Sequence, residues 1–196
     1  MTALLERLRA APGWSRYALA ALLQLAAVGA MVAGQAAILR HGVDVTLATA
    51  PVDPRDFLRG DYVVLRYAIS TLDPAKLETF EPVAAGDTVY VRLAPGADGL
   101  HEARGLTRSL PPPDPGRPVL RGRVGRWSSC PARETCKSVA VEYGLESYFV
   151  PEGEGRAIER TPMARVRVVA AVAADGRARI RRLLIDGKMV YEEPPF

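Results

Sequence analysis

The stretch VRVVAAVAADGRARIRRLLIDGKMVY, residues 166–191, gives the clearest indication of the fold. Three runs rich in β-forming residues are separated by two Asp-Gly pairs; the runs are 166–173, 177–185 and 188–191, and the pairs are Asp175-Gly176 and Asp186-Gly187. Asp-Gly between such runs favours a tight hairpin turn, because both residue types tolerate a positive φ. The stretch therefore predicts a C-terminal meander of three antiparallel strands.

The middle strand of this meander is rich in arginine. Arg177, Arg179 and Arg181 alternate with other residues, so they should share one face of the strand. A basic strand face of this kind favours exposure to solvent. Binding of anions or lipid headgroups is the alternative interpretation.

Similar patterns extend upstream. Further β-rich runs predict strands at Val43–Thr49, Tyr62–Ile69, Thr88–Leu93, Val119–Trp127 and Ser138–Leu145. Leu72–Phe80 resembles a short helix, with Asp73 as its cap and Pro74 in its first turn. We therefore expect residues 42–192 to form one mainly β domain, an antiparallel sheet or barrel-like fold with short helices, which is large enough to bury its own core.

The N-terminal part of the chain contains one long apolar run, Tyr17–Leu39, without a charged residue. At about 1.5 Å per residue, a helix of this length crosses a hydrocarbon core about 30 Å thick. Arg7, Arg9 and Arg16 precede the run, and only Arg40 follows it closely, which favours a cytoplasmic N-terminus. The expected organisation is residues 1–16 in the cytoplasm, a single transmembrane helix at 17–39 in a bacterial cytoplasmic membrane, and an extracytoplasmic, periplasmic domain at 42–192.

A cleaved signal peptide is the main alternative to this retained signal-anchor. Residues 28–30 and 34–36 both offer small residues in a cleavage-like pattern, but the apolar run is longer than a usual signal core. Either interpretation places the domain outside the cytoplasm. A buried helix of a soluble protein is the third possibility.

One face of the apolar run is built from small residues. Ala26, Ala30 and Gly34 recur every four positions, and Gln24 and Gln35 add amide groups. Such a face allows a second membrane helix to approach closely. The plain alternative is an alanine-rich composition that scatters alanine along the helix.

The two cysteines, Cys130 and Cys136, are separated by five intervening residues. In an oxidising compartment this spacing favours a structural disulfide, with free thiols as the alternative. A zinc site needs about four ligands, and the sequence has only two histidines, so we expect neither a metal nor another cofactor.

Charge and composition argue against nucleic-acid binding. The net charge is +4, and most of it comes from the arginines of residues 1–40, which leaves the main domain nearly neutral. A nucleic-acid partner normally requires a strongly basic domain. The apolar fraction of 48% and the charged fraction of 24% are those of an ordinary folded protein.

The segment Gly60-Asp61-Tyr62-Val-Val-Leu65-Arg-Tyr67 matches, position for position, the signature that names the GDYXXLXY protein family. Residues 52–59, 86–91 and 143–153 also resemble segments of that family. The resemblance implies a bacterial membrane-anchored protein of unassigned function, and some members are encoded beside, or fused to, multi-spanning membrane proteins. It supports a membrane location and a membrane partner, and it supplies no mechanism.

Two interpretations of the signature remain open. In the first, Gly60-Asp61 forms a turn, and the strand that follows packs into the core. In the second, polar residues cluster around a groove with tyrosine at its wall. The candidate binding and motif residues are Asp53, Arg55, Asp56, Arg59, Gly60, Asp61, Tyr62, Leu65, Tyr67, Glu146 and Tyr148.

No recognisable catalytic constellation is present, so a catalytic residue is not assigned. Neither histidine lies in a Ser-His-Asp motif, and no glycine-rich phosphate loop occurs. We therefore expect a non-catalytic module that binds or regulates an integral membrane partner. The alternative is an extracytoplasmic enzyme or ligand-binding protein that acts on cell-envelope material through the Asp/Tyr/Glu residues.

Overall fold

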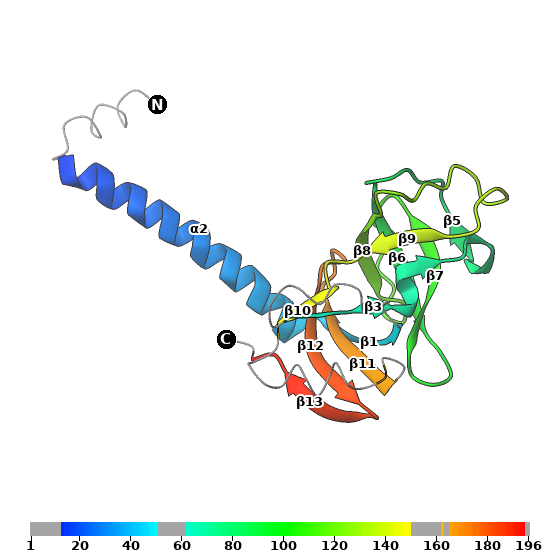
Figure 1. The fold of residues 1–196 in the computed structure, drawn as a ribbon. Coiled ribbons are helices and arrows are strands. Elements are labelled where there is room, and N and C mark those ends of the chain that lie inside the picture. The colour runs from blue at the N-terminus through cyan, green and yellow to red at the C-terminus, as the bar shows by residue number, and fades with distance from the viewer. Residues whose placement is uncertain (1–12, 51–61, 150–161, 163–164, 195–196) are drawn as a thin grey trace. The chain divides into compact units, whose positions relative to one another are not determined.

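The computed structural model describes residues 13–50, 62–149, 162 and 165–194 of the chain (Figure 1). The chain divides into two compact units, residues 1–37 and residues 38–196. The described part of the first unit belongs to one helix, α2 (Gly13–His41), whose last turn belongs to the second unit. Every strand of the described residues lies in the second unit.

Helix α2 is 29 residues long, or about 44 Å at the usual rise. Among the described residues it is the one helix long and apolar enough to span a membrane. Its sequence is dominated by Ala and Leu, which are good helix formers, and side chains 17–33 are exposed. A helix that is apolar on every face and lies outside a protein core fits a lipid environment.

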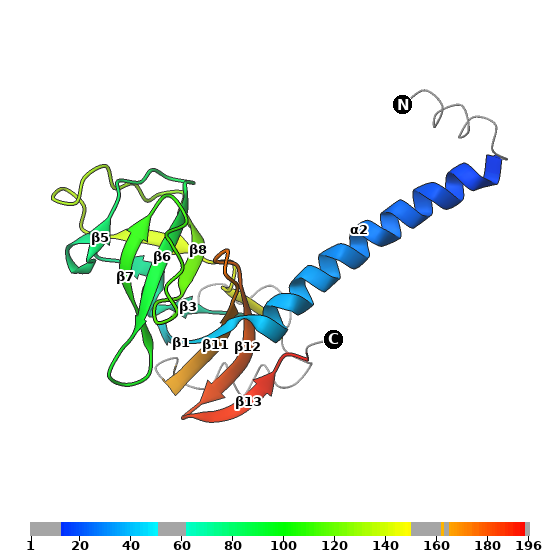
Figure 2. The ribbon, with the colours of Figure 1, turned by 180° about the vertical axis from the view of Figure 1, so that it is seen from behind.

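Five strands form the first sheet, in the order β13-β12-β11-β1-β3. Their bounds are β1 Val43–Ala50, β3 Arg66–Tyr67, β11 Val166–Val172, β12 Ala178–Ile185 and β13 Lys188–Glu192. Strands β11, β12 and β13 lie side by side in chain order (Figures 1 and 2), so the predicted C-terminal meander is confirmed. Asp186 and Gly187 both have a positive φ, as expected for this turn, whereas only Gly176 does so in the first one.

Six strands form the second sheet, in the order β4-β9-β8-β6-β7-β5. Their bounds are β4 Thr71–Leu72, β5 Thr79–Phe80, β6 Thr88–Pro95, β7 His101–Thr107, β8 Val119–Val124 and β9 Val139–Glu142. The pairings are antiparallel apart from β5 with β7. A two-stranded ribbon joins β2 (Tyr62–Val64) to β10 (Ser147–Phe149). The mainly β fold class with one N-terminal apolar helix is confirmed.

The structure corrects the prediction for residues 72–80. Asp73 does cap a turn that starts at Pro74, since its Oδ1 accepts the Ala75 N–H at 3.0 Å. That turn is the single 3₁₀ turn η2 (Pro74–Lys76), and the chain then pairs as β5 instead of continuing as a helix. The predicted strand 62–69 is likewise divided at Leu65, because β2 pairs with β10 whereas β3 pairs with β1. The 3₁₀ turn η1 (Ala68–Ser70) then follows β3.

Alternating burial builds the core between these sheets. In β6, Val89, Val91 and Leu93 are fully buried, whereas the residues between them are half-buried. Residues from both sheets contribute to one cluster that includes Leu47, Leu120 and Val168. The two sheets therefore share one main hydrophobic cluster.

Candidate functional site

Two of the segments that resemble the family, the signature at 60–67 and the segment at 143–153, pair with each other through β2 and β10. In the ribbon, Tyr62 of β2 faces Phe149 of β10, and Val64 faces Ser147. The backbone N–H of Leu65 extends the pairing by donating to the Glu146 carbonyl at 2.7 Å. The signature segment and the segment that starts at Tyr143 are therefore one local structure, although they lie far apart in the chain.

Two buried tyrosines connect these segments reciprocally, an arrangement that we term the tyrosine clasp (Tyr67 and Tyr143). The Tyr67 hydroxyl donates to the carbonyl of Leu145 at 2.6 Å. The Tyr143 hydroxyl donates in the other direction, to the carbonyl of Ile69, at 2.8 Å. Each hydroxyl thus satisfies a backbone carbonyl of the opposite segment, as buried polar groups require.

The clasp lies where the chain passes from one sheet to the other. Tyr67 ends β3 of the first sheet, and Tyr143 follows β9 of the second. A further link between the sheets is the hydrogen bond from the Thr46 N–H of β1 to His101 Nδ1 of β7, at 3.2 Å. The tyrosines therefore help to hold the two sheets together.

The side chain of Glu146 supports the clasp by holding the backbone at Tyr143. Its Oε1 accepts the backbone N–H of Tyr143 at 2.6 Å. Burial, and to a smaller extent the charge of Glu146, raises the pKa of both Tyr67 and Tyr143 far above the ordinary value. Both phenols are therefore neutral hydrogen-bond donors at physiological pH.

The sequence-predicted site residues fall into two groups. Leu65 and Tyr67 are each only 1% exposed and belong to the core, and Glu146 is half-buried beside them. Burial places Tyr67 in the interior and not at the wall of a groove. The backbones of Tyr62 and Tyr148 are described, but their side chains are not. The other predicted site residues lie wholly outside the described residues; they are Asp53, Arg55, Asp56, Arg59, Gly60 and Asp61.

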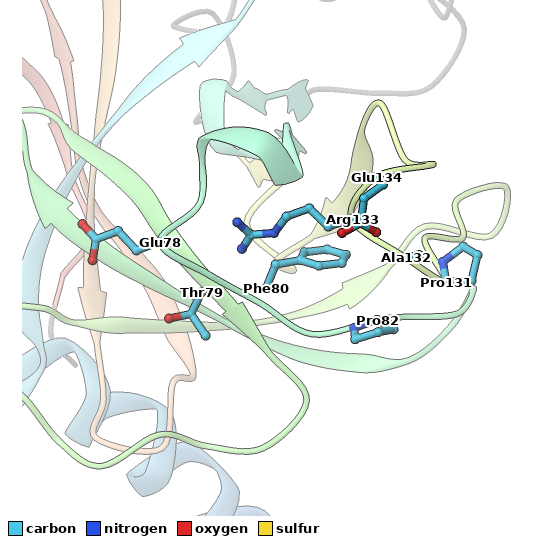
Figure 3. A pocket seen from close by; sticks show the side chains of 8 residues that line it. All are labelled: Glu78, Thr79, Phe80, Pro82, Pro131, Ala132, Arg133 and Glu134. Atoms are coloured by element: carbon cyan, nitrogen blue, oxygen red, sulfur yellow. The ribbon is translucent and has the colours of Figure 1, made fainter.

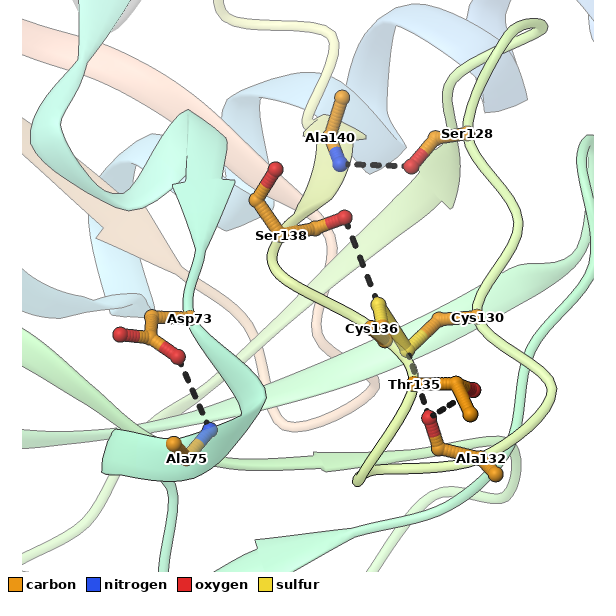
Figure 4. Close-up of a disulfide and its surroundings, with 9 residues drawn as sticks. All are labelled: Asp73, Ala75, Ser128, Cys130, Ala132, Thr135, Cys136, Ser138 and Ala140. Carbon is orange, nitrogen blue, oxygen red and sulfur yellow. Dashed lines mark hydrogen bonds between the residues drawn. A yellow bond between two sulfur atoms is a disulfide. The ribbon is translucent and has the colours of Figure 1, made fainter.

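The predicted disulfide between Cys130 and Cys136 is present (Figure 4). Cys130 is fully buried, and its backbone exchanges two hydrogen bonds with Val83, at 2.8 and 2.9 Å. The disulfide thus closes a short loop and fixes it to the segment that follows β5.

A shallow depression of about 530 Å³ lies beside this loop (Figure 3). Arg133 of the loop lies over the ring of Phe80, with 5.8 Å between its Cζ atom and the ring centroid. Pro82 and Pro131 line the same depression. The disulfide and the cation–π contact together fix the shape of this surface.

Replacing both cysteines with alanine is expected to lower the free energy of unfolding by about 2 kcal/mol, because a short loop gives a modest entropic gain. Urea unfolding of the full-length protein in detergent micelles measures this change. A reductant should lower the free energy of unfolding of the wild type by a similar amount. It should leave that of the Cys130→Ala/Cys136→Ala variant unchanged. Equal sensitivity of both proteins to the reductant would contradict the prediction.

A second polar cluster, which the sequence did not predict, lies where α2 ends. Arg181 donates hydrogen bonds to the carbonyls of Leu39 and Gly42 and forms an ion pair with Asp44. Arg182 binds the same carboxylate. Arg181 therefore caps the C-terminal end of the helix, where backbone carbonyls lack partners within the helix.

A β-bulge makes this cluster possible and corrects the predicted regular alternation of β12. Val169 pairs with Arg182 and Ala170 pairs with Ile180, so Arg181 is the extra residue. In a regular strand, consecutive side chains point to opposite faces. The bulge lets both arginines reach Asp44.

The described residues contain no group of three or more His, Cys, Asp or Glu side chains that is placed to hold a metal ion.

The fold and the helix together define a β-rich domain that carries an N-terminal apolar helix long enough to cross a membrane. The chain belongs to the GDYXXLXY family, whose model, described as "GDYXXLXY protein", matches residues 24–183. No curated protein and no solved structure matches the chain.

Proposed function

We propose that this protein is a single-pass membrane protein whose β-domain lies on the outer side of a bacterial cytoplasmic membrane. The length and apolar surface of α2 support the span. The three arginines before the apolar run and the single arginine after it support a cytoplasmic N-terminus. The disulfide supports an oxidising compartment for the domain.

We further propose that the protein is a non-catalytic module that binds an integral membrane partner through α2. The observation that carries this proposal is the small-residue face of Ala26, Ala30 and Gly34. Ala26 and Ala30 are exposed, and apart from the backbone of the adjacent helical turns and the two chain neighbours, no described atom lies within 4 Å of a Cβ built on Gly34. This face is thus left open for a second helix, and small residues allow two helix backbones to come close.

The Ala30→Leu variant tests the partner. Leucine on the small-residue face prevents close approach of a second helix, so a single stoichiometric partner should be recovered at least about tenfold less than with wild type, which equals roughly 1.4 kcal/mol. The measurement is affinity capture from detergent-solubilised membranes, quantified by mass spectrometry.

Ala21→Leu is the matched control, because Ala21 is also exposed and lies on the opposite face of the helix. Equal capture by both variants, or repeated recovery of the protein alone, argues against the proposal. Topology is checked separately with reporters fused after Phe196. A reporter that works only in the cytoplasm would refute the proposed orientation.

A further inference from the structure

Three arginines on and after β8 have no ion pair or side-chain hydrogen bond to another described residue. Arg121 and Arg123 are exposed and two positions apart, so they share the outward face of β8. Arg126 is exposed in the turn that follows. Next to it, Trp127 is 96% exposed, which is unusual for the largest apolar side chain. We term Arg121, Arg123, Arg126 and Trp127 the β8 patch.

The surroundings leave the β8 patch positive. Tyr90 of β6 lies opposite Arg121 and Thr88 lies opposite Arg123, and neither is a carboxylate. On the other side, Glu142 of β9 lies opposite Arg123. Among the cross-strand partners of Arg121 and Arg123, Glu142 is thus the one carboxylate, and the nearby Asp87 and Asp175 are paired with Arg108 and Arg177. The three arginines therefore give the patch a charge complementary to an anionic surface.

Strand β11 and the turn after it connect the last turn of α2 with the start of the patch. Ile38 and Leu39, in the last turn of α2, form a buried cluster with Ala171 of β11. The turn after β11 then reaches β8, where the Arg121 N–H donates to the Gly176 carbonyl at 2.8 Å. A short series of packed contacts therefore leads from the end of the helix to the first arginine of the patch.

We propose that the β8 patch lies against the anionic phospholipid surface of the membrane that holds α2. This inference rests on the proposed membrane anchoring. The helix brings the domain to a bilayer surface, so a phospholipid headgroup layer is the anionic surface most constantly within reach. Arginine binds headgroup phosphates, and tryptophan favours the interface between headgroups and acyl chains.

Quenching of Trp127 by lipid tests this contact in the full-length protein. Trp14→Phe leaves Trp127 as the only tryptophan. The protein is reconstituted into vesicles whose phosphatidylcholine carries brominated acyl chains, either alone or in an equimolar mixture with phosphatidylglycerol. We expect quenching and a blue shift of Trp127 emission in the mixture, and loss of both in Arg121→Glu/Arg123→Glu.

The matched control is Lys76→Glu/Lys188→Glu, which reverses two charges outside the patch and should behave as wild type. Unquenched Trp127 in the mixture, or equal loss in control and patch variants, would overturn the inference. So would a blue shift with soluble polyglutamate but none with phosphatidylglycerol vesicles, which would identify an acidic protein as the partner class. Carbonate extraction separates the two proposals: extracted protein refutes the anchoring, whereas retained protein with unquenched Trp127 refutes only the lipid contact.

Discussion

Replacing Tyr67 with alanine is expected to lower the free energy of unfolding by about 3–5 kcal/mol. The side chain is 1% exposed and belongs to the core, so truncation leaves a large cavity. It also removes the hydroxyl that donates to the Leu145 carbonyl at 2.6 Å. The Tyr67→Phe variant isolates this second effect and should lose about 1–3 kcal/mol, because a buried carbonyl is left without its donor.

Urea unfolding of the full-length protein in detergent micelles, followed by circular dichroism of the β-domain, measures both losses. Tyr90→Phe serves as the control for deletion of a hydroxyl, since Tyr90 is only half-buried on the outer face of β6. If Tyr67→Phe and Tyr90→Phe have the same stability, the clasp does not stabilise the fold.

The second large effect is alkaline unfolding. Burial, together with the smaller influence of the Glu146 charge, raises the pKa of Tyr67 and Tyr143 in the folded protein, whereas tyrosines of the unfolded chain ionise near pH 10. Above about pH 10 the unfolded state therefore binds fewer protons than the folded state, and stability falls as the pH rises. The free energy of unfolding falls by about 1.4 kcal/mol per pH unit for each tyrosine, which is roughly 3 kcal/mol per pH unit for the pair.

The free energy of unfolding at a series of values between about pH 9 and pH 12 measures this slope. Tyr67→Phe/Tyr143→Phe should be less stable than wild type at neutral pH and should also have a shallower alkaline slope. The stability that the two neutral phenols contribute is fully present below about pH 10 and is lost above it. Equal slopes for wild type and the double variant would show that these tyrosines ionise as easily in the folded protein as in the unfolded one.

The clasp changes how the signature is interpreted. From the sequence, a packed strand and the wall of a binding groove were both open interpretations of Tyr67. In the structure, Leu65 and Tyr67 are both in the core, and the hydroxyl of Tyr67 is bonded to backbone. Leu65 and Tyr67, at the end of the signature, therefore stabilise the junction of the two sheets. The polar residues that precede them, Asp53 to Asp61, lie outside the described residues.

Local patterns were sufficient for the elements whose stability depends on neighbours in the chain. The Asp-Gly pairs predicted the meander, because a positive φ is a property of the turn residues themselves. Helix α2 was predictable from the length of its apolar run, and the disulfide from two cysteines close in sequence. Each of these signals is contained within a few residues or a few turns.

Tertiary structure alone decided the rest. Strand β7 is polar and lacks alternation, and it forms because β6 and β5 offer it backbone partners. The clasp joins residues 78 and 74 positions apart, and Arg181 reaches the end of α2 only because β12 carries a bulge. Such contacts depend on how the chain closes in space, and periodicity along the sequence carries no information about that closure.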